Sequence, residues 1–355
     1  MDRKLAWVGL NLLPSLTPRR RDLLLRRYGG PVEAWQSLSK GLPADLRKDI
    51  SDKALSELKG ADPERELALA QRAGAKILTA DDGEYPPPLR QIPSAPSVLY
   101  MLGQWEARDV CAVAIVGTRR CTSYGQLVAK RLGAEIAGRG VTVVSGLAPG
   151  IDTAAHQGAL SAGRTIAVLG SGLGKPYPAG SERLIGEIAQ RGAVATEFPW
   201  EMSGSQWTFP RRNRIVAGLA LAVVVIEAPD RSGALITVDY ALAQGKEVLA
   251  VPGPITSEAS RGSNRLIQDG AKLVASVEDV LSEIGISPVA TAQSRELDLS
   301  PEARCLYDLL SREPLDPSEL VARTGLSHAQ VSQILVELLL RGLVQELPGR
   351  TYVRP

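Results

Sequence analysis

The chain has 355 residues, of which 44% are hydrophobic and 23% charged, and its 41 basic and 39 acidic side chains leave a formal net charge of +2. At roughly 150 residues per domain, this length predicts two to three domains with sizeable cores. The balanced charge excludes a disordered tail protein and a histone-like polycation.

Residues 1–75 predict a small helical domain with the only basic excess of the chain. Apolar residues recur at helical spacing around Leu24 and Trp35, and Gly29-Gly30-Pro31 is a stop signal between two helices. The block holds 14 basic and 10 acidic residues, whereas residues 76–290 hold 20 of each. The near-neutral total is therefore an average over unlike parts.

Prolines crowd the next segment, 76–110, which predicts an extended lead-in to the following domain. The prolines concerned are Pro86, Pro87, Pro88, Pro93 and Pro96.

Residues 111–284 alternate between apolar β-branched runs, Gly-rich loops and helical runs. The expected strands are 111–116, 141–144, 165–169, 193–196, 222–226, 247–251 and 272–274, and the expected helices are 123–137, 151–161, 181–190, 212–219 and 234–244. Uninterrupted apolar strands separated by helices are typical of a parallel sheet covered on both faces. The pattern predicts a doubly wound α/β domain over residues 76–285.

A Ser/Pro/Thr/Gln-rich linker follows over residues 286–300, and the last segment, 301–355, predicts a winged helix-turn-helix. Three helices are expected over 301–311, 317–323 and 327–341, followed by a hairpin of 344–347 and 351–353. The last segment holds 6 basic and 7 acidic residues, and its third helix, 327–341, is mostly apolar. Strong duplex binding needs several phosphate contacts, so we expect a protein contact or weak duplex binding here, with Arg350 and Arg354 as the cationic exceptions.

Basic residues gather in the loops that follow the strands of the α/β domain. In an open parallel sheet these loops meet at one edge, where glycines expose backbone amides and arginines supply charge. The pattern predicts a site for an anionic, phosphate-bearing ligand. Eight basic residues belong to this set: Arg119, Arg120, Lys175, Arg211, Arg212, Arg214, Arg231 and Arg261.

The standard nucleotide and catalytic motifs are absent. The segment Gly170–Lys175 is one residue short of a Walker loop and is followed by Pro176, and it lacks the third glycine of a dinucleotide fingerprint. Asp152 and His156 are spaced to share one face of a helix. We favour a helix-capping Asp with a structural His over a general base, and we expect no enzyme activity.

Cysteine and histidine usage predicts neither a metal site nor a disulfide framework. The chain has two histidines and three widely separated cysteines. We also find no export signal and no membrane-spanning stretch, and expect a cytoplasmic protein without cofactors.

Six ordered sequence blocks between residues 80 and 285 resemble the DNA-processing protein A (DprA/Smf) family. They are Ile115-Val-Gly-Thr-Arg119, Val143-Val-Ser-Gly-Leu-Ala148 with Gly150-Ile-Asp152 and Ala155-His156, Ile166-Ala-Val-Leu-Gly170, Phe209-Pro-Arg-Arg-Asn-Arg-Ile215, Ser232-Gly-Ala-Leu-Ile-Thr237 and Ala250-Val-Pro-Gly253.

The resemblance implies a Rossmann-like core that binds single-stranded DNA, protects incoming DNA during natural transformation and helps to load the RecA recombinase. It implies a homodimer, and we add single-strand-binding protein and weakly bound duplex DNA as further candidate partners. The helical domain is similar to SAM and helix-hairpin-helix domains. Its arginines Arg19, Arg20, Arg21, Arg26 and Arg27 are either DNA contacts or one solvated helix face, and the sequence leaves both open.

Matching positions give the expected DNA-binding residues, to which Arg212 and Lys175 are added on charge and loop position. The set is Gly117, Thr118, Arg119, Ser145, Gly146, Lys175, Arg211, Arg212, Asn213 and Arg214. Four aromatic residues in the same loops either stack on bases or pack in the core, with Trp207 the best stacking candidate: Tyr124, Tyr177, Trp207 and Phe209.

The alternative is a nucleotide phosphoribohydrolase of the cytokinin-activating LOG type, whose Rossmann-like core is similar. That family depends on a Gly-Gly-x-Gly-Thr-x-x-Glu stretch. The nearest segment, Gly233–Tyr240, has Ala234, Ile236 and Tyr240 at three of these positions, and only Asp239 could replace the carboxylate. The binding protein is therefore the favoured hypothesis.

Overall fold

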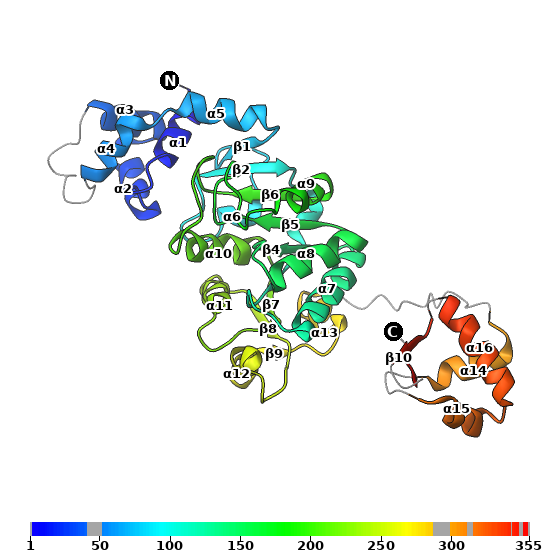
Figure 1. Ribbon diagram of the computed structural model, residues 1–355. Coiled ribbons are helices and arrows are strands. Elements are labelled where there is room, and N and C mark those ends of the chain that lie inside the picture. Colours follow the sequence, from blue (N-terminus) through cyan, green and yellow to red (C-terminus); the bar gives the residue numbers. More distant parts are fainter. Residues whose placement is uncertain are drawn as a thin grey trace. The chain divides into compact units, whose positions relative to one another are not determined.

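The computed structural model describes residues 2–40, 52–286, 299–310, 315–341, 343–347 and 351–353, and Figure 1 shows their helices and strands. The chain divides into two compact units, Met1–Pro288 and Val289–Pro355. Arg350 and Arg354, expected as cationic exceptions of the second unit, lie outside the described residues.

One sheet runs through the larger unit, and the described residues give it nine strands in the order β1-β2-β6-β5-β4-β3-β7-β8-β9. All pairs from β6 to β9 along this order are parallel, so the expected doubly wound α/β fold is confirmed. The strands are β1 (Lys76–Thr79), β2 (Val98–Gly103), β3 (Ala112–Val116), β4 (Thr142–Ser145), β5 (Thr165–Val168), β6 (Ala193–Thr196), β7 (Ala222–Val225), β8 (Glu247–Ala250) and β9 (Lys272–Leu273).

The proline-rich lead-in contributes two strands to this sheet rather than a plain extended connector. Strand β2 pairs antiparallel with β6, with Met101 opposite Ala195, and β1 pairs antiparallel with β2. The five prolines all fall between these two strands, where α6 (Pro87–Arg90) lies, so the ladder loses no amide donor.

Helices cover both faces of the sheet, and the side chains of its central strands β3, β4 and β7 are therefore buried on both sides. Alternation along β3 sends Val113 and Ile115 to one core cluster and Ala114 and Val116 to another. The first cluster packs under α7 (Ser123–Gly138), α8 (Ile151–Ala162) and α13 (Val277–Glu283). The second packs under α10 (Thr208–Leu219), α11 (Gly233–Ala243) and α12 (Arg261–Gln268), and α9 (Glu182–Arg191) lies over β5 and β6.

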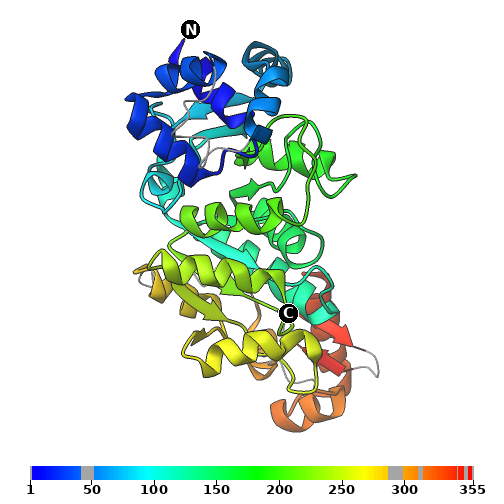
Figure 2. The ribbon, with the colours of Figure 1, turned by 90° about the vertical axis from the view of Figure 1, so that its left-hand side faces the viewer.

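The N-terminal helices pack against the start of the sheet, as the second view shows with the blue helices beside the cyan strands (Figure 2). Trp7 donates its indole N–H to Asp81 over 2.7 Å, and Asn11 donates its amide to the backbone oxygen of Glu197 over 2.9 Å. The helices are α1 (Arg3–Asn11), α2 (Pro18–Tyr28), α3 (Pro31–Lys40), α4 (Asp52–Gly60) and α5 (Pro63–Arg72).

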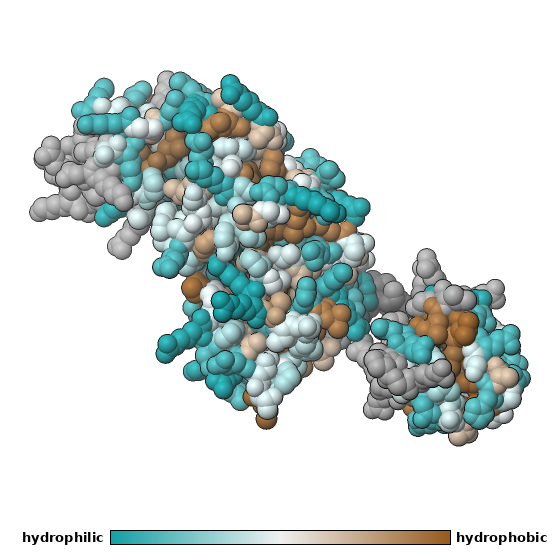
Figure 3. All heavy atoms as spheres, in the orientation of Figure 1, coloured by the Kyte–Doolittle hydropathy of each residue, from teal (hydrophilic) through white to brown (hydrophobic). Residues whose placement is uncertain are grey.

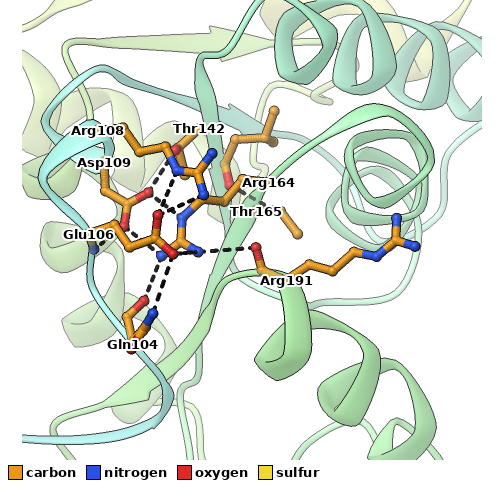
Figure 4. A network of polar contacts seen from close by, with 9 residues as sticks. Gln104, Glu106, Arg108, Asp109, Thr142, Arg164, Thr165 and Arg191 are labelled. Carbon is orange, nitrogen blue, oxygen red and sulfur yellow. Dashed lines mark hydrogen bonds and ion pairs between the residues drawn. The ribbon is translucent and has the colours of Figure 1, made fainter.

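Arg164, a buried arginine, immediately precedes β5 and therefore lies at the amino ends of the parallel strands, away from the carboxyl ends where the site is predicted. Figure 4 shows its network of polar contacts. Arg164 donates Nε and Nη2 to the two oxygens of Asp109, over 2.6 and 2.8 Å, and Nη1 to Glu106 over 3.0 Å. Both Arg164 and Asp109 are almost fully shielded from solvent, so this bidentate pair is a structural anchor.

The smaller unit is a winged-helix domain, as expected. Side chains of Ser300, Asp316 and Ser327 cap its three helices, and Gly325 ends the second one in the left-handed conformation, at φ 71°. Its elements are α14 (Pro301–Leu309), α15 (Pro317–Thr324), α16 (His328–Leu340), β10 (Gln345–Leu347) and β11 (Thr351–Val353).

The exposed face of α16 carries no Lys or Arg side chain among the described residues of that helix. Its exposed members include His328, Gln330, Gln333 and Val336. Arg341, the basic residue of the predicted helix 327–341, caps α16 and pairs with Glu337. With so few cations the helix supplies little phosphate neutralisation, and a protein contact or weak duplex binding stays our expectation for this domain.

None of the helices in the described part of the chain is both long and apolar enough to span a membrane. On the face drawn in Figure 3, apolar side chains occur in small patches among hydrophilic ones.

Candidate functional site

A cavity of about 790 Å³ opens at the carboxyl ends of β3 and β7. Strand β3 lies between β4 and β7, so the chain leaves it toward one side and returns on the other. Ligands of open α/β sheets bind at this switch point, because loops and helix N-termini diverge there. The cavity is therefore where the fold itself predicts a ligand.

The loop after β3 forms one wall of the cavity and lies very close to neighbouring backbone. A Cβ on Gly117 would lie 2.8 Å from the backbone oxygen of Glu227 and 2.5 Å from Ile151, so only glycine fits there. Thr118 donates its amide to the same oxygen of Glu227 over 2.7 Å. The loop is thus pinned at its start.

Arg119 stands at this wall, exposed to solvent, with its guanidinium against aromatic rings. Its central carbon lies 4.8 Å from the ring centre of Phe209 and 5.5 Å from that of Tyr177, and the two rings are 4.9 Å apart. Within the described chain no carboxylate pairs with Arg119. Aromatic faces orient a guanidinium without using its N–H donors, so these remain available to an anion.

The arginines of the run 211–214 are divided between two faces of one helix. The sequence predicted a loop up to this run and a helix only from Arg212, but α10 begins at Thr208, which bonds back to Ser205. Helical periodicity then turns Phe209, Arg212 and Asn213 toward the cavity, and places Arg211 and Arg214 elsewhere.

Arg212 lines the cavity but uses one of its nitrogens on backbone. It is 4% exposed, and Nη1 donates to the carbonyl oxygens of Gly146 and Val168. Burial lowers the pKa of Arg212 to about 10, opposed by the carboxylate of Asp152. A side chain at position 146 would collide with the Arg212 guanidinium, so only glycine fits at this position.

Arg211 and Arg214 both turn to the buried carboxylate of Glu197 instead of the cavity. Their Nη2 atoms lie 2.8 and 2.6 Å from Oε2 of Glu197, and the Arg214 and Glu197 side chains are 5% and 2% exposed. Burial lowers the pKa of Arg214, with Glu197 opposing the shift. In this geometry Arg214 holds α10 in place and has no free surface for a ligand.

A further buried arginine, Arg21 of α2, approaches this cluster from the N-terminal helices. Its Nη2 donates to Asn11 over 3.4 Å, and burial, followed by repulsion from Arg211, lowers its pKa to about 10. Arg26 and Arg27 are exposed, Arg20 is half-buried, and the side chain of Arg19 lies outside the described part. The five arginines therefore do not form one solvated helix face, since Arg21 is interior.

Six of the ten predicted DNA-binding residues line the cavity: Gly117, Thr118, Arg119, Gly146, Arg212 and Asn213. The remaining four lie elsewhere. Ser145 is fully buried and donates to Ile115 over 2.6 Å, Lys175 is exposed outside the lining, and Arg211 and Arg214 pair with Glu197.

The second wall comes from residues outside the ten predicted DNA-binding positions, mostly around the N-terminus of α11, with Gln206 from the segment before α10. They are Gln206, Arg231, Ser232, Gly233 and Thr237, and Glu258 follows from the next loop. The sequence did carry signals for this wall, because Arg231 is one of the eight loop cations and Ser232–Thr237 is one of the six family blocks. The Ser232 hydroxyl accepts from the Ala234 amide and caps α11.

Trp207 is 47% exposed at the start of α10 and meets Phe198 edge to face, at 5.9 Å between ring centres. Tyr124 and Tyr177 are 43% and 37% exposed. These three aromatic residues are partly accessible rather than core residues, whereas Phe209 fills space beside Gly170 and Gly204.

Asp152 and His156 do not bond to each other. Asp152 accepts from the amides of Gly146 and Ala148 over 3.2 and 3.3 Å, which holds the loop after β4. The Thr165 hydroxyl donates to the Val143 oxygen, so His156 donates through Nδ1 to Thr165 over 2.7 Å. A buried histidine in this pairing is structural.

We expect this histidine to make the protein less stable in acid. Burial, then repulsion from Arg212, lowers the pKa of His156 to about 3. The unfolded chain takes up this proton near pH 6.5 and the folded chain does not, so the stabilisation is complete above pH 6.5 and is lost as pH falls toward 3. From pH 7.5 to 5.5 the loss is about 1.4 kcal/mol.

The measurement is urea unfolding followed by tryptophan fluorescence, in wild type and His156→Asn. Equal losses of stability between the two pH values in both proteins would contradict the buried neutral state.

Comparisons with known proteins match both units. Residues 76–285 match the family described as DNA recombination-mediator protein A, and residues 289–350 match the DprA winged helix domain. The chain is 39% identical over 365 residues to the putative DNA processing protein DprA of Mycobacterium tuberculosis, covering 97% of this chain and 93% of that one.

Two solved structures share the fold. DNA processing protein A from Streptococcus pneumoniae has a TM-score of 0.64 and 34% identity, over 79% of this chain and 95% of that one. DNA processing protein A from Helicobacter pylori, which was solved to describe its single-stranded DNA binding mode, has a TM-score of 0.52 and 28% identity, over 58% and 94%.

Proposed function

The chain belongs to the DprA/Smf family of DNA recombination-mediator proteins, and from this premise we propose that it binds single-stranded DNA in the cavity at the ends of β3 and β7. In this role it protects incoming strands during natural transformation and helps to load RecA onto them, in the cytoplasm and as a homodimer. The single-stranded DNA binding described for the H. pylori protein supports the ligand class.

The observation that carries the proposal is Arg119, an exposed cation without an acidic partner in the described chain, at the wall of a 790 Å³ cavity. Phosphate oxygens are the natural acceptors for such a guanidinium. Backbone amides of the Gly117 loop and the capped N-terminus of α11 lie around the same cavity and favour an anion.

We expect these contacts to bind single-stranded DNA of any base sequence. The charged groups of the cavity contact phosphates, which carry no base identity. Tyr177, which packs beside Arg119 and Phe209, and Trp207, which precedes α10, are 37% and 47% exposed. As part of this proposal they stack on bases of any kind, each contributing ~1 to 3 kcal/mol. Lys175 extends the cationic surface, whereas Ser145, Arg211 and Arg214 act by holding the walls.

A phosphoribohydrolase activity is less well supported. Asp239, the only carboxylate that could complete that motif, is exposed on α11 and does not line the cavity. Asp152 lines it but is already bonded to two loop amides. We therefore propose a recombination mediator without catalytic chemistry.

The test is to titrate an end-labelled oligothymidine at several salt concentrations. Binding through four phosphates gives a log-log slope of about −2.8, at ~0.7 per phosphate of a single strand. In parallel, nucleoside monophosphates are incubated with the protein and assayed for base release. Base release without strand binding contradicts the proposal and favours the hydrolase.

A further inference from the structure

Glu227 is a buried carboxylate immediately behind the loop that carries Arg119. It lies two residues after β7, and it is 1% exposed. Its Oε2 accepts the backbone amide of Thr122 over 2.8 Å, and its Oε1 accepts the Thr122 hydroxyl over 2.6 Å. Both carboxylate oxygens are therefore used at one point of the loop.

The backbone of the same residue holds the other end of the loop. The carbonyl oxygen of Glu227 accepts the amide of Thr118 over 2.7 Å. Glu227 thus fixes Thr118 and Thr122, and the residues between them, including Arg119, are held from both ends. Because one residue holds both ends of the loop, Glu227 determines the backbone position from which the Arg119 side chain extends.

Close packing supports this attachment. A Cβ on Gly125, in the first turn of α7, would lie 2.2 Å from Oε2 of Glu227, so the helix approaches the carboxylate as closely as glycine permits. The Thr122 hydroxyl in turn accepts the amide of Gly125 and caps α7. Carboxylate, cap and helix form one connected unit.

The charge of Glu227 makes its position unusual. No basic side chain of the described residues pairs with it, and it lies below a loop that we propose binds phosphates. A buried carboxylate costs free energy, and at this place it also repels the ligand. Its benefit is therefore geometric: charged hydrogen bonds to a loop and a helix N-terminus.

We propose that Glu227 is a positioning residue for single-stranded DNA binding, which sets the Arg119 loop in its phosphate-binding geometry without touching the strand. The inference rests on the proposed function of this site. Charge and geometry have opposite effects here: removal of a negative charge near phosphates would by itself strengthen binding, whereas loss of the positioned loop weakens it.

The test is Glu227→Gln, which keeps the shape and removes the charge and one acceptor. We expect oligothymidine binding about 5- to 10-fold weaker, with the salt slope flatter by up to ~0.7 because the phosphate contact of Arg119 is lost or lengthened. We also expect the double variant Arg119→Ala/Glu227→Gln to bind no more weakly than Arg119→Ala alone.

Thr122→Val and Thr122→Ser form a matched pair that keeps the test decisive where Glu227→Gln folds poorly. Valine removes the hydroxyl that bonds Glu227, and serine keeps it, so we expect valine to lose more affinity than serine. Tryptophan fluorescence checks that each variant is folded.

Three results overturn the inference: Glu227→Gln binding as tightly as or more tightly than wild type, additive losses in the double variant, or equal binding by the two Thr122 variants. Absence of strand binding by wild type would instead contradict the proposed function itself.

Discussion

Replacing Arg119 by alanine is expected to weaken binding of single-stranded DNA about 30-fold, for all sequences alike. A charge-assisted contact from a guanidinium to a phosphate contributes ~2 kcal/mol, which corresponds to this factor. The side chain is exposed and oriented by Phe209 and Tyr177, so its loss removes a ligand contact rather than part of the core. The salt slope should flatten by ~0.7.

The measurement is the same oligothymidine titration at several salt concentrations, with homopolymers of other bases for comparison. Arg183→Ala is the matched control, because Arg183 is 91% exposed on α9 and pairs only with Glu187 among the described residues. It removes the same charge away from the cavity. An Arg119→Ala variant that changes affinity only for duplex DNA, or no more than Arg183→Ala does, would show that the site is misplaced.

Replacing Arg214 by methionine is expected to lower the free energy of unfolding by about 3 kcal/mol, the usual effect of removing one partner of a buried ion pair. Arg214 lies 2.6 Å from Glu197, and both side chains are almost fully buried. Methionine fills the space of the aliphatic stem but leaves Glu197 with Arg211 as its remaining ion-pair partner within the described chain.

Urea unfolding followed by tryptophan fluorescence measures this effect in the larger unit alone, because all five tryptophans belong to it. Glu197→Gln should also be destabilising, since it leaves Arg211, Arg214 and Arg21 without their shared carboxylate. The double variant should lose less than the sum of the two single losses. Additive losses, or a loss below about 1 kcal/mol for Arg214→Met, would contradict a buried pair.

Arg119 and Arg214 belong to the same predicted set of phosphate contacts, yet their environments in the fold are opposite. Both residues are arginines within family motifs. The sequence does not show which face of α10 meets the cavity and which face packs against Glu197, so it does not separate the role of Arg214 from that of Arg119. The predicted helix 212–219 already held Arg212 and Arg214, and the earlier start at Thr208 adds Arg211 to the same helix.

The predicted strands from 111 to 274 match β3 to β9 because each is a short apolar run between Gly-rich loops, a local pattern. Strands β1 and β2 were missed for a non-local reason. Their residues are extended in either interpretation, and only pairing of β2 with β6, about ninety residues away, makes them part of the sheet.

The carboxylates behind the site were missed for the same reason. Glu197 and Glu227 are single acidic residues after predicted strands, and nothing beside them in sequence marks them. Their partners are 14 to 105 residues away along the chain.

The sequence by itself therefore determined the family, the α/β architecture, the winged helix and the edge of the sheet where the cavity lies, because these depend on local periodicity, strand order and ordered motifs. Tertiary structure alone decided which cations face the cavity and which are neutralised in the interior. That choice depends on helix phase and on burial beside distant carboxylates, and both arise only when the chain has folded.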